Sequence, residues 1–259
     1  MNLIKTALVA VIGGCVGAAA LEGFHRLVPA TGTPNGIESV IHRYVVSHPE
    51  ILQEAMAELE KRQNIADVEK GRAAVKNNAS VIFNSPRQVT IGNKSGDVTL
   101  VEFFDYNCPY CKHALADLTS LMKSDDKLRV VLKELPVLGP GSVEAAQVGV
   151  ALRMQDPTGE KYLSFHEKLL GVRGQADGAK AIAVAQEVGA DMTRLQADLR
   201  SDEVKASIDE SRKLAEELGL NGTPSYVIGP DVVIGAVGLD TLREKVKSAR
   251  CSAGVTAAC

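Results

Sequence analysis

The chain has 259 residues, of which 45% are hydrophobic, enough for one sizeable core and a smaller unit. Its formal net charge is -3, it lacks Trp and only 4% of its residues are aromatic, so neither a basic field nor a stacking platform indicates nucleic-acid binding. Of the five cysteines, Cys15 lies in the N-terminal apolar stretch. The other four form two pairs, which suits an oxidising compartment.

Residues 1–23 have the pattern of an export signal. Lys5 precedes the apolar run Thr6–Leu21, and Ala18–Ala20 supplies small residues for a cleavage site. The run is short for a membrane span, which needs roughly 20 apolar residues, so we expect a cleaved signal, with an uncleaved membrane anchor as the alternative. Lipid attachment at Cys15 is a minor option, because the apolar run continues past it. The protein is therefore expected to be periplasmic or otherwise exported.

An N-terminal helical segment is predicted over residues 37–85, after a linker at 24–36 that contains two prolines and two glycines. Apolar residues recur at helical spacing, first in residues 37–45 and again in residues 52–59. Between them, Ser47-His48-Pro49-Glu50 supplies a cap and a proline for the first turn of a second helix. Short helices bury little surface alone, so these either pack on the main domain or self-associate as an oligomerisation stalk.

A buried strand is predicted over residues 98–104, after a short strand at 89–91, because its side chains are almost all apolar. The exception is Glu102, and a carboxylate in a buried strand is costly unless it has a task. One task is to take or relay the proton of the more buried of two thiols that follow. The alternative places Glu102 at a sheet edge, facing solvent.

The strand leads into Cys108-Pro109-Tyr110-Cys111 at the start of a predicted helix, and a strand at 128–135 follows that helix. This order predicts a right-handed βαβ unit with a parallel strand pair. Helix N–H groups and the helix dipole stabilise a thiolate at the first cysteine, so Cys108 is expected to attack and Cys111 to resolve the mixed disulfide.

A metal site is the rival interpretation of these cysteines. A closed zinc or iron–sulfur site needs about four ligands, and no second pair of thiols or histidines stands at a suitable spacing. His113 lies two positions after Cys111, so on a helix it points roughly to the opposite side and is expected at the surface. We therefore predict a redox dithiol and no metal.

The chain from residue 140 to about 219 is predicted to be a helical insertion, capped by Ser142, with His166 in or beside its core. A hairpin at 226–229 and 232–235 and a last helix at 239–249 follow. Thr223-Pro224 precedes the hairpin, and we expect a cis bond there that exposes a backbone edge to an extended peptide. The alternative is an ordinary turn proline.

The tail at 250–259 contains two cysteines, one near its start and one at its last position. Cys251 and Cys259 enclose small, flexible residues, so closure of the loop is feasible. Outside the cytoplasm we expect a structural disulfide between them. Free thiols or an intermolecular pair are the alternatives.

These motifs resemble the DsbA-like branch of the thioredoxin superfamily. The resemblance is carried by residues 102–111, by Lys133-Glu134-Leu135-Pro136 and by Gly222-Thr223-Pro224, and it covers residues 86–249. It implies an α/β thioredoxin fold with an inserted helical subdomain, preceded by the N-terminal helical segment. Residues 45–63 are similar to the N-terminal segment of ScsC-type proteins, the copper-tolerance thiol oxidoreductases. In some of these the segment oligomerises and favours disulfide isomerase work, which favours the stalk.

The resemblance also implies roles for single residues. Cys108 matches the nucleophile and Cys111 the resolving thiol, Glu102 matches the buried acid, and Thr223-Pro224 matches the cis-proline loop that faces the thiols. The dipeptide between the thiols departs from the family pattern. It is Pro109-Tyr110, where strongly oxidising members have Pro-His, and the missing His favours a gentler redox poise.

The function expected from the sequence is an exported protein thiol–disulfide oxidoreductase with isomerase or mixed oxidase and isomerase activity. Its partners would be client proteins with thiols or disulfides, a membrane or exported redox partner, and further copies of itself through residues 37–85. The dithiol itself is the redox group, so no bound cofactor is expected. The alternatives are a monomeric dithiol oxidase and, in another class, a protein that binds Cu(I) through the same two thiolates.

Overall fold

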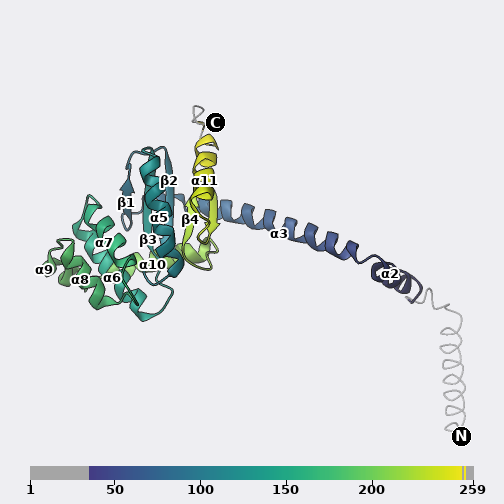
Figure 1. The fold of residues 1–259 in the computed structure, drawn as a ribbon, viewed down its shortest axis with the longest axis horizontal. Helices are drawn as coiled ribbons and strands as arrows, with labels where there is room; N and C mark the ends of the chain where they lie inside the picture. The colour runs from purple at the N-terminus through teal and green to yellow at the C-terminus, as the bar shows by residue number, and fades with distance from the viewer. Residues whose placement is uncertain (1–34, 253, 255–259) are drawn as a thin grey trace, which may run out of the picture. The chain divides into compact units, whose positions relative to one another are not determined.

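The computed structural model describes residues 35–252 and residue 254. The predicted export signal, almost all of the predicted linker, and Cys259 lie outside the described residues. The described chain divides into two compact units, one that ends at Gln63 and one that starts at Asn64 (Figure 1).

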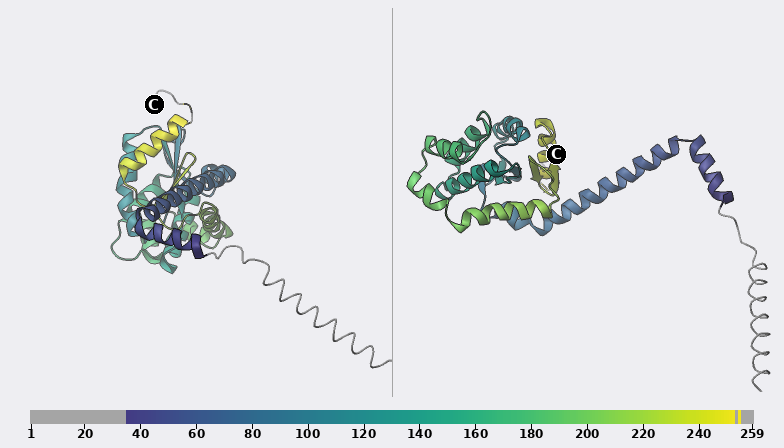
Figure 2. Two further views of the ribbon diagram at one scale, coloured as in Figure 1. Left: turned by 90° about the vertical axis from the view of Figure 1, so that its right-hand side faces the viewer. Right: turned by 90° about the horizontal axis from the view of Figure 1, so that it is seen from below.

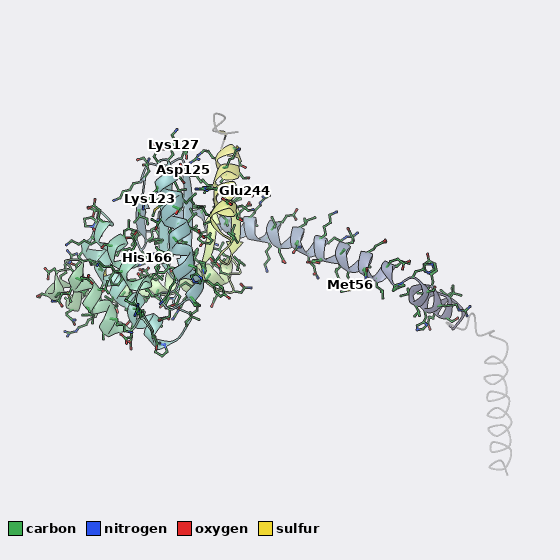
Figure 3. The ribbon with its side chains drawn as sticks, viewed as in Figure 1. Met56, Lys123, Asp125, Lys127, His166 and Glu244 are labelled. Atoms are coloured by element: carbon green, nitrogen blue, oxygen red, sulfur yellow. The ribbon has the colours of Figure 1, made fainter. Side chains whose placement is uncertain are left out.

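The first unit consists of helix α2 (Asn35–Ser47) and the beginning of helix α3 (Glu50–Asn77). Both predicted helices are therefore present, and α2 starts inside the segment that was predicted to be a linker. Most of their large apolar side chains are more than half exposed, as Met56 on α3 illustrates (Figure 3). These residues are Ile37, Val40, Ile41, Tyr44, Val46, Leu52, Met56 and Leu59. A stripe of this kind is typical of a helix face that binds another surface.

The second unit is built on a five-stranded sheet of order β1-β3-β2-β4-β5. The strands are β1 (Val89–Gly92), β2 (Val98–Phe104), β3 (Leu128–Glu134), β4 (Ser225–Ile228) and β5 (Asp231–Ile234). Strands β2 and β3 are parallel and are joined through helix α5 (Pro109–Ser124), which confirms the predicted βαβ unit. The other neighbours are antiparallel.

Helices cover both faces of this sheet, which explains the nearly continuous apolar sequence of β2. Helices α5 and α11 (Leu239–Ser252) pack on one face. On the other face lie α4 (Ala79–Asn84), α10 (Asp202–Glu217) and the end of α3, where Val75 and Ile82 pack with Phe103. Residues 64–85, which were predicted to belong to the N-terminal segment, are therefore part of this second unit.

The helical insertion comprises α6 (Pro140–Gln155), α7 (Glu160–Leu170), α8 (Gly178–Glu187), α9 (Met192–Asp198) and α10. Helices α6 to α9 gather beside the sheet (Figures 1 and 2). The predicted cap at Ser142 is wrong, because α6 begins two residues earlier. Pro140 occupies its first turn, where the missing N–H costs little and the fixed φ suits a helix. Ser142 lies inside the helix and is buried.

His166 of α7 lies in the core of the second unit, as expected (Figure 3). Its ring packs edge-on against Phe104 with the ring centroids 4.5 Å apart. Burial lowers the pKa of His166 to about 3, so the imidazole is neutral at physiological pH. It serves as a packing residue between the sheet and the insertion.

Candidate active site

Cys108 is the N-cap residue of helix α5, directly after the loop that leaves strand β2. Pro109 follows inside the first turn. Cys111 lies one turn further along, and both thiols are free and buried. The parallel pair β2–β3 and its crossover helix thus place the first cysteine at the end of the helix that presents unpaired N–H groups.

The bond between Thr223 and Pro224 is cis, as the sequence predicted. The thiol of Cys108 donates to the backbone oxygen of Thr223 at a distance of 3.0 Å. The loop is held from both sides, because Gly235 N donates to Pro224 O at 2.8 Å and Ser225 Oγ donates to Gly222 O at 2.7 Å. The fold therefore brings together the dithiol and a loop that is 115 positions away in the chain.

Glu102 lies in the interior, with only 2% of its surface exposed, so the solvent-facing alternative is wrong. Among the described residues its Oε2 atom has no hydrogen-bond partner. Burial raises the pKa of Glu102 to about 8, so the carboxyl group is mostly protonated at pH 7.

Cys111 and Glu102 influence each other electrostatically. Burial raises the pKa of the Cys111 thiol, and the negative charge of Glu102 raises it further. The same carboxylate also acts on Tyr226, whose pKa is raised chiefly by burial. A buried acid and a buried thiol that cannot both be ionised are suited to share and exchange one proton.

Sequence reasoning assigned no role to the residues between Glu102 and Cys108, and the structure shows that they anchor the loop before the nucleophile. The buried carboxylate of Asp105 accepts from Asn107 N at 2.7 Å, Val137 N at 2.8 Å and Leu138 N at 3.0 Å. The available signal was the pair of Asp and Asn side chains just before the Cys-x-x-Cys, since such side chains bond to nearby backbone.

The surface beside the thiols is partly apolar. Tyr110, the residue before Cys111, has 63% of its surface exposed. Val137 and Leu138, whose N–H groups Asp105 holds, are about half exposed. The side chain of Tyr110 therefore faces solvent, where it can contact a molecule that approaches Cys108.

The remaining sequence-predicted residues do not enter this site. His113 is exposed on α5, as expected. Cys251 is disulfide-bonded, but Cys259 lies outside the described residues, so the pairing of these two cysteines stays a prediction. In the described part of the chain, no group of three or more His, Cys, Asp or Glu side chains is placed to hold a metal ion. Nor do residues 35–252 contain a helix that is long and apolar enough to cross a membrane.

Two protein families match separate parts of the chain. Residues 99–247 match the family described as DSBA-like thioredoxin domain, which includes β2, the dithiol, the insertion and the hairpin. Residues 36–64 match the family described as copper resistance protein ScsC N-terminal domain. The second match covers α2 and the beginning of α3, the unit with the exposed apolar stripe.

Solved structures with the same fold include a thioredoxin-like oxidoreductase from Silicibacter pomeroyi, with 44% identity and a TM-score of 0.63, covering 66% of this chain and 97% of that one. ScsC of Proteus mirabilis has 28% identity and a TM-score of 0.64, covering 84% and 97%. A periplasmic thioredoxin-like protein of Salmonella enterica serovar Typhimurium has 32% identity and a TM-score of 0.61, covering 67% and 95%.

Some curated relatives are much longer proteins. The Na(+)/H(+) antiporter NhaA 1 of Salinispora arenicola is 26% identical over 160 residues, which are 61% of this chain. This chain spans only 24% of the length of that antiporter.

Proposed function

The chain belongs to the family of DsbA-like thioredoxin domains, and on that premise we propose that it is an exported thiol–disulfide oxidoreductase acting on protein disulfides through Cys108 and Cys111. The Cys108 thiolate attacks a client disulfide, one client sulfur leaves as a thiolate, and a mixed disulfide forms. Cys111 then attacks the Cys108 sulfur, releases the reduced client and leaves an oxidised Cys108–Cys111 pair. In the opposite direction the oxidised pair accepts a client thiolate.

One observation carries this proposal: Cys108 is the N-cap residue of helix α5, and its sulfur lies 3.0 Å from the backbone oxygen of Thr223 in a cis-proline loop. The helix N-terminus stabilises negative charge on the sulfur. The loop beside it has a backbone edge along which an extended client segment can lie, so that a client sulfur comes into line with Cys108.

The resolving step needs a proton acceptor, because the pKa of the Cys111 thiol is raised by burial. Glu102 is suited to this task, since its own pKa of about 8 lets it take up and give back a proton near neutral pH. In its ionised form it accepts the Cys111 proton as Cys111 attacks the mixed disulfide. In its protonated form it returns the proton in the opposite direction.

Export is supported by the signal-like pattern of residues 1–23 and by the similarity to a periplasmic thioredoxin-like protein. The dithiol needs an external electron donor or acceptor after each turnover, so a membrane or exported redox partner belongs to the proposal. The dithiol itself serves as the redox group, and no bound cofactor is required.

The proposed direction is isomerase or mixed isomerase and oxidase activity. The exposed apolar stripe of α2 and α3 supports self-association through residues 37–63, which would present two or more active sites to one client. The Pro109-Tyr110 dipeptide supports a gentle redox poise, because no His stands between the thiols to stabilise the thiolate further. A monomeric dithiol oxidase is the alternative.

The activity is tested by reduction of an insulin disulfide and by recovery of native ribonuclease from a scrambled form. Wild type should catalyse both, and Cys108→Ser should catalyse neither, while an Asp126→Asn control on the exposed turn before β3 should match wild type. Insulin reduction without recovery of ribonuclease would remove the isomerase proposal and leave the oxidoreductase. Wild-type turnover equal to that of Cys108→Ser would remove both.

Self-association is tested by sedimentation of wild type and of the double variant Ile41→Asp/Met56→Asp. Charges on the exposed stripe should convert an oligomer into monomers, because a buried unpaired carboxylate is costly. Ile234→Asp is the matched control, since Ile234 is also exposed but lies on β5 in the other unit. A monomeric wild type would contradict the stalk.

Cu(I) binding is a second candidate function, supported by the match of residues 36–64 to the copper resistance protein ScsC N-terminal domain. Two soft, free thiols close together can hold Cu(I). Titration of the reduced protein with Cu(I) in a competing chelator should give tight one-to-one binding that Cys108→Ala abolishes. Binding with no disulfide turnover would replace the enzyme proposal, and absence of binding would remove this candidate.

A further inference from the structure

The side chain of Asn107, directly before the nucleophile, joins the catalytic loop to the helical insertion. Its Nδ2 atom donates to Ser142 Oγ at 3.0 Å and to Ala176 O at 2.8 Å. Its Oδ1 atom accepts from Ala176 N at 2.6 Å. The opposite amide orientation would set a donor against the N–H of Ala176 and an acceptor against its carbonyl, so the pairing defines the orientation.

The partners of Asn107 are buried parts of the insertion. Ser142 is 1% exposed in the first turns of α6, and Ala176 is 0% exposed in the loop before α8. Ala176 offers both of its backbone polar groups to one amide side chain, as two neighbouring strands would do. A smaller apolar side chain at position 107 would leave these buried polar groups without hydrogen-bond partners, which is costly.

The backbone of Asn107 is fixed as well. Its N–H donates to the carboxylate of Asp105 at 2.7 Å, and the N–H of Cys108 donates to the backbone oxygen of Asp105 at 3.0 Å. The residue that aims Cys108 is thus held at its main chain by Asp105 and at its side chain by the insertion. Because the stabilisation of charge at a helix N-terminus falls off within one turn, small displacements of the Cys108 sulfur matter.

We propose that Asn107 is a positioning residue through which the helical insertion holds Cys108, the N-cap residue of α5, in place and so sets the redox equilibrium of the dithiol. The inference rests on the proposed thiol chemistry and adds a task for the insertion within it. In the reduced form, the N-terminus of the helix stabilises negative charge that develops on the Cys108 sulfur. Loosening the sulfur therefore disfavours the reduced form and makes the disulfide a weaker oxidant.

The test measures the equilibrium in which the protein disulfide and two glutathione molecules give the protein dithiol and glutathione disulfide. Protein is the electron acceptor and glutathione the donor, so atoms and electrons balance. The chain has no Trp, so the redox state is followed by trapping free thiols with a maleimide that adds mass. Thermal unfolding of both redox forms is recorded alongside.

Asn107→Ala should lower this equilibrium constant at least threefold, and should slow the reaction of Cys108 with iodoacetamide at pH 7 by a similar factor. Ser142→Ala removes one of the three hydrogen bonds and should lower the constant about twofold. Asn93→Ala is the matched control. Asn93 also donates to a backbone oxygen, of Asp126 at 2.8 Å, and accepts from a backbone N–H, of Ser95 at 2.9 Å, but it lies in the loop after β1.

If Asn107 has a purely structural role, Asn107→Ala will lower the thermal stability of both redox forms equally. Its equilibrium constant with glutathione will then stay within 1.5-fold of wild type, which is also the result expected for the control Asn93→Ala. That result would overturn the inference. If Asn107→Ala does not fold, an unchanged constant in Ser142→Ala overturns it. The glutathione equilibrium of the wild type is measurable without any client, so failure of the proposed client activity is seen separately.

Discussion

Replacement of Glu102 by Gln tests whether a buried acid beneath the dithiol titrates as the structure indicates. The carboxyl group is almost fully buried, and burial raises its pKa from 4.5 to about 8. The folded protein therefore binds a proton that the unfolded chain releases over this interval. The contribution of Glu102 to the stability of the wild type is therefore greatest below pH 4.5, falls as the pH rises toward 8, and is constant above that.

The size of the effect follows from the interval. From pH 4.5 to pH 7 the Glu102 carboxyl group ionises in the unfolded chain, which stabilises the unfolded state, while the same group stays mostly protonated in the folded protein. At 1.36 kcal/mol per pH unit this amounts to about 3 kcal/mol at pH 7. Gln does not ionise in either state, so Glu102→Gln should be more stable than wild type by about 2–3 kcal/mol at pH 7. This gain is smaller than the full cost of keeping Glu102 protonated, because a buried amide without hydrogen-bond partners is itself costly.

The assay is urea denaturation of the reduced protein at several pH values from 4 to 8. The two stability curves should meet within about 1 kcal/mol near pH 4 and diverge as the pH rises. Glu244→Gln on the exposed side of α11 is the control and should run parallel to wild type (Figure 3). Parallel curves for Glu102→Gln and wild type would refute the raised pKa of Glu102 and with it the proton exchange with Cys111.

Three further outcomes are expected. Cys111→Ser should trap a mixed disulfide between Cys108 and a client, visible on a non-reducing gel, whereas rapid release would contradict the resolving role. Gly149→Ala should lower the free energy of unfolding by about 1–3 kcal/mol, because the added Cβ would lie 3.2 Å from both Glu134 Oε1 and Tyr106 OH. Urea denaturation identical to that of wild type would contradict this and show that these two side chains move to make room for the Cβ. Lys133→Met should stabilise the protein at pH 7, because burial lowers the pKa of Lys133 to about 8 and the charged ammonium group is therefore less stable in the folded than in the unfolded state. The gain in stability should shrink above pH 8, where Lys133 of the folded wild type is neutral. A gain that stays constant with pH would contradict this pKa.

Local sequence patterns were sufficient for most of the fold. Strand β2 has the predicted bounds 98–104, and the insertion and the hairpin lie where they were expected, because apolar periodicity and Gly or Pro at the ends are local signals. The start of α6 was placed wrongly at Ser142. Both Pro140 and Ser142 are plausible helix starts by sequence, and Ser142 bonds Asn107 instead of capping the helix.

The sequence by itself determined the chemistry of the site: two thiols one helical turn apart at a helix N-terminus, an acid in the preceding strand, and a Thr-Pro before a hairpin. Those features depend on spacing along one strand and one helix, which local rules govern. Only the tertiary structure decided that Glu102 is buried beside Cys111, that Thr223 lies 3.0 Å from Cys108, and that Asn107 is held by Ser142 and Ala176. The hydrogen bonds of Asn107 and Cys108 join positions 35 to 115 residues apart, and the burial of Glu102 depends on the helices that cover its strand. Both depend on how elements distant in the sequence pack together, which no local pattern specifies.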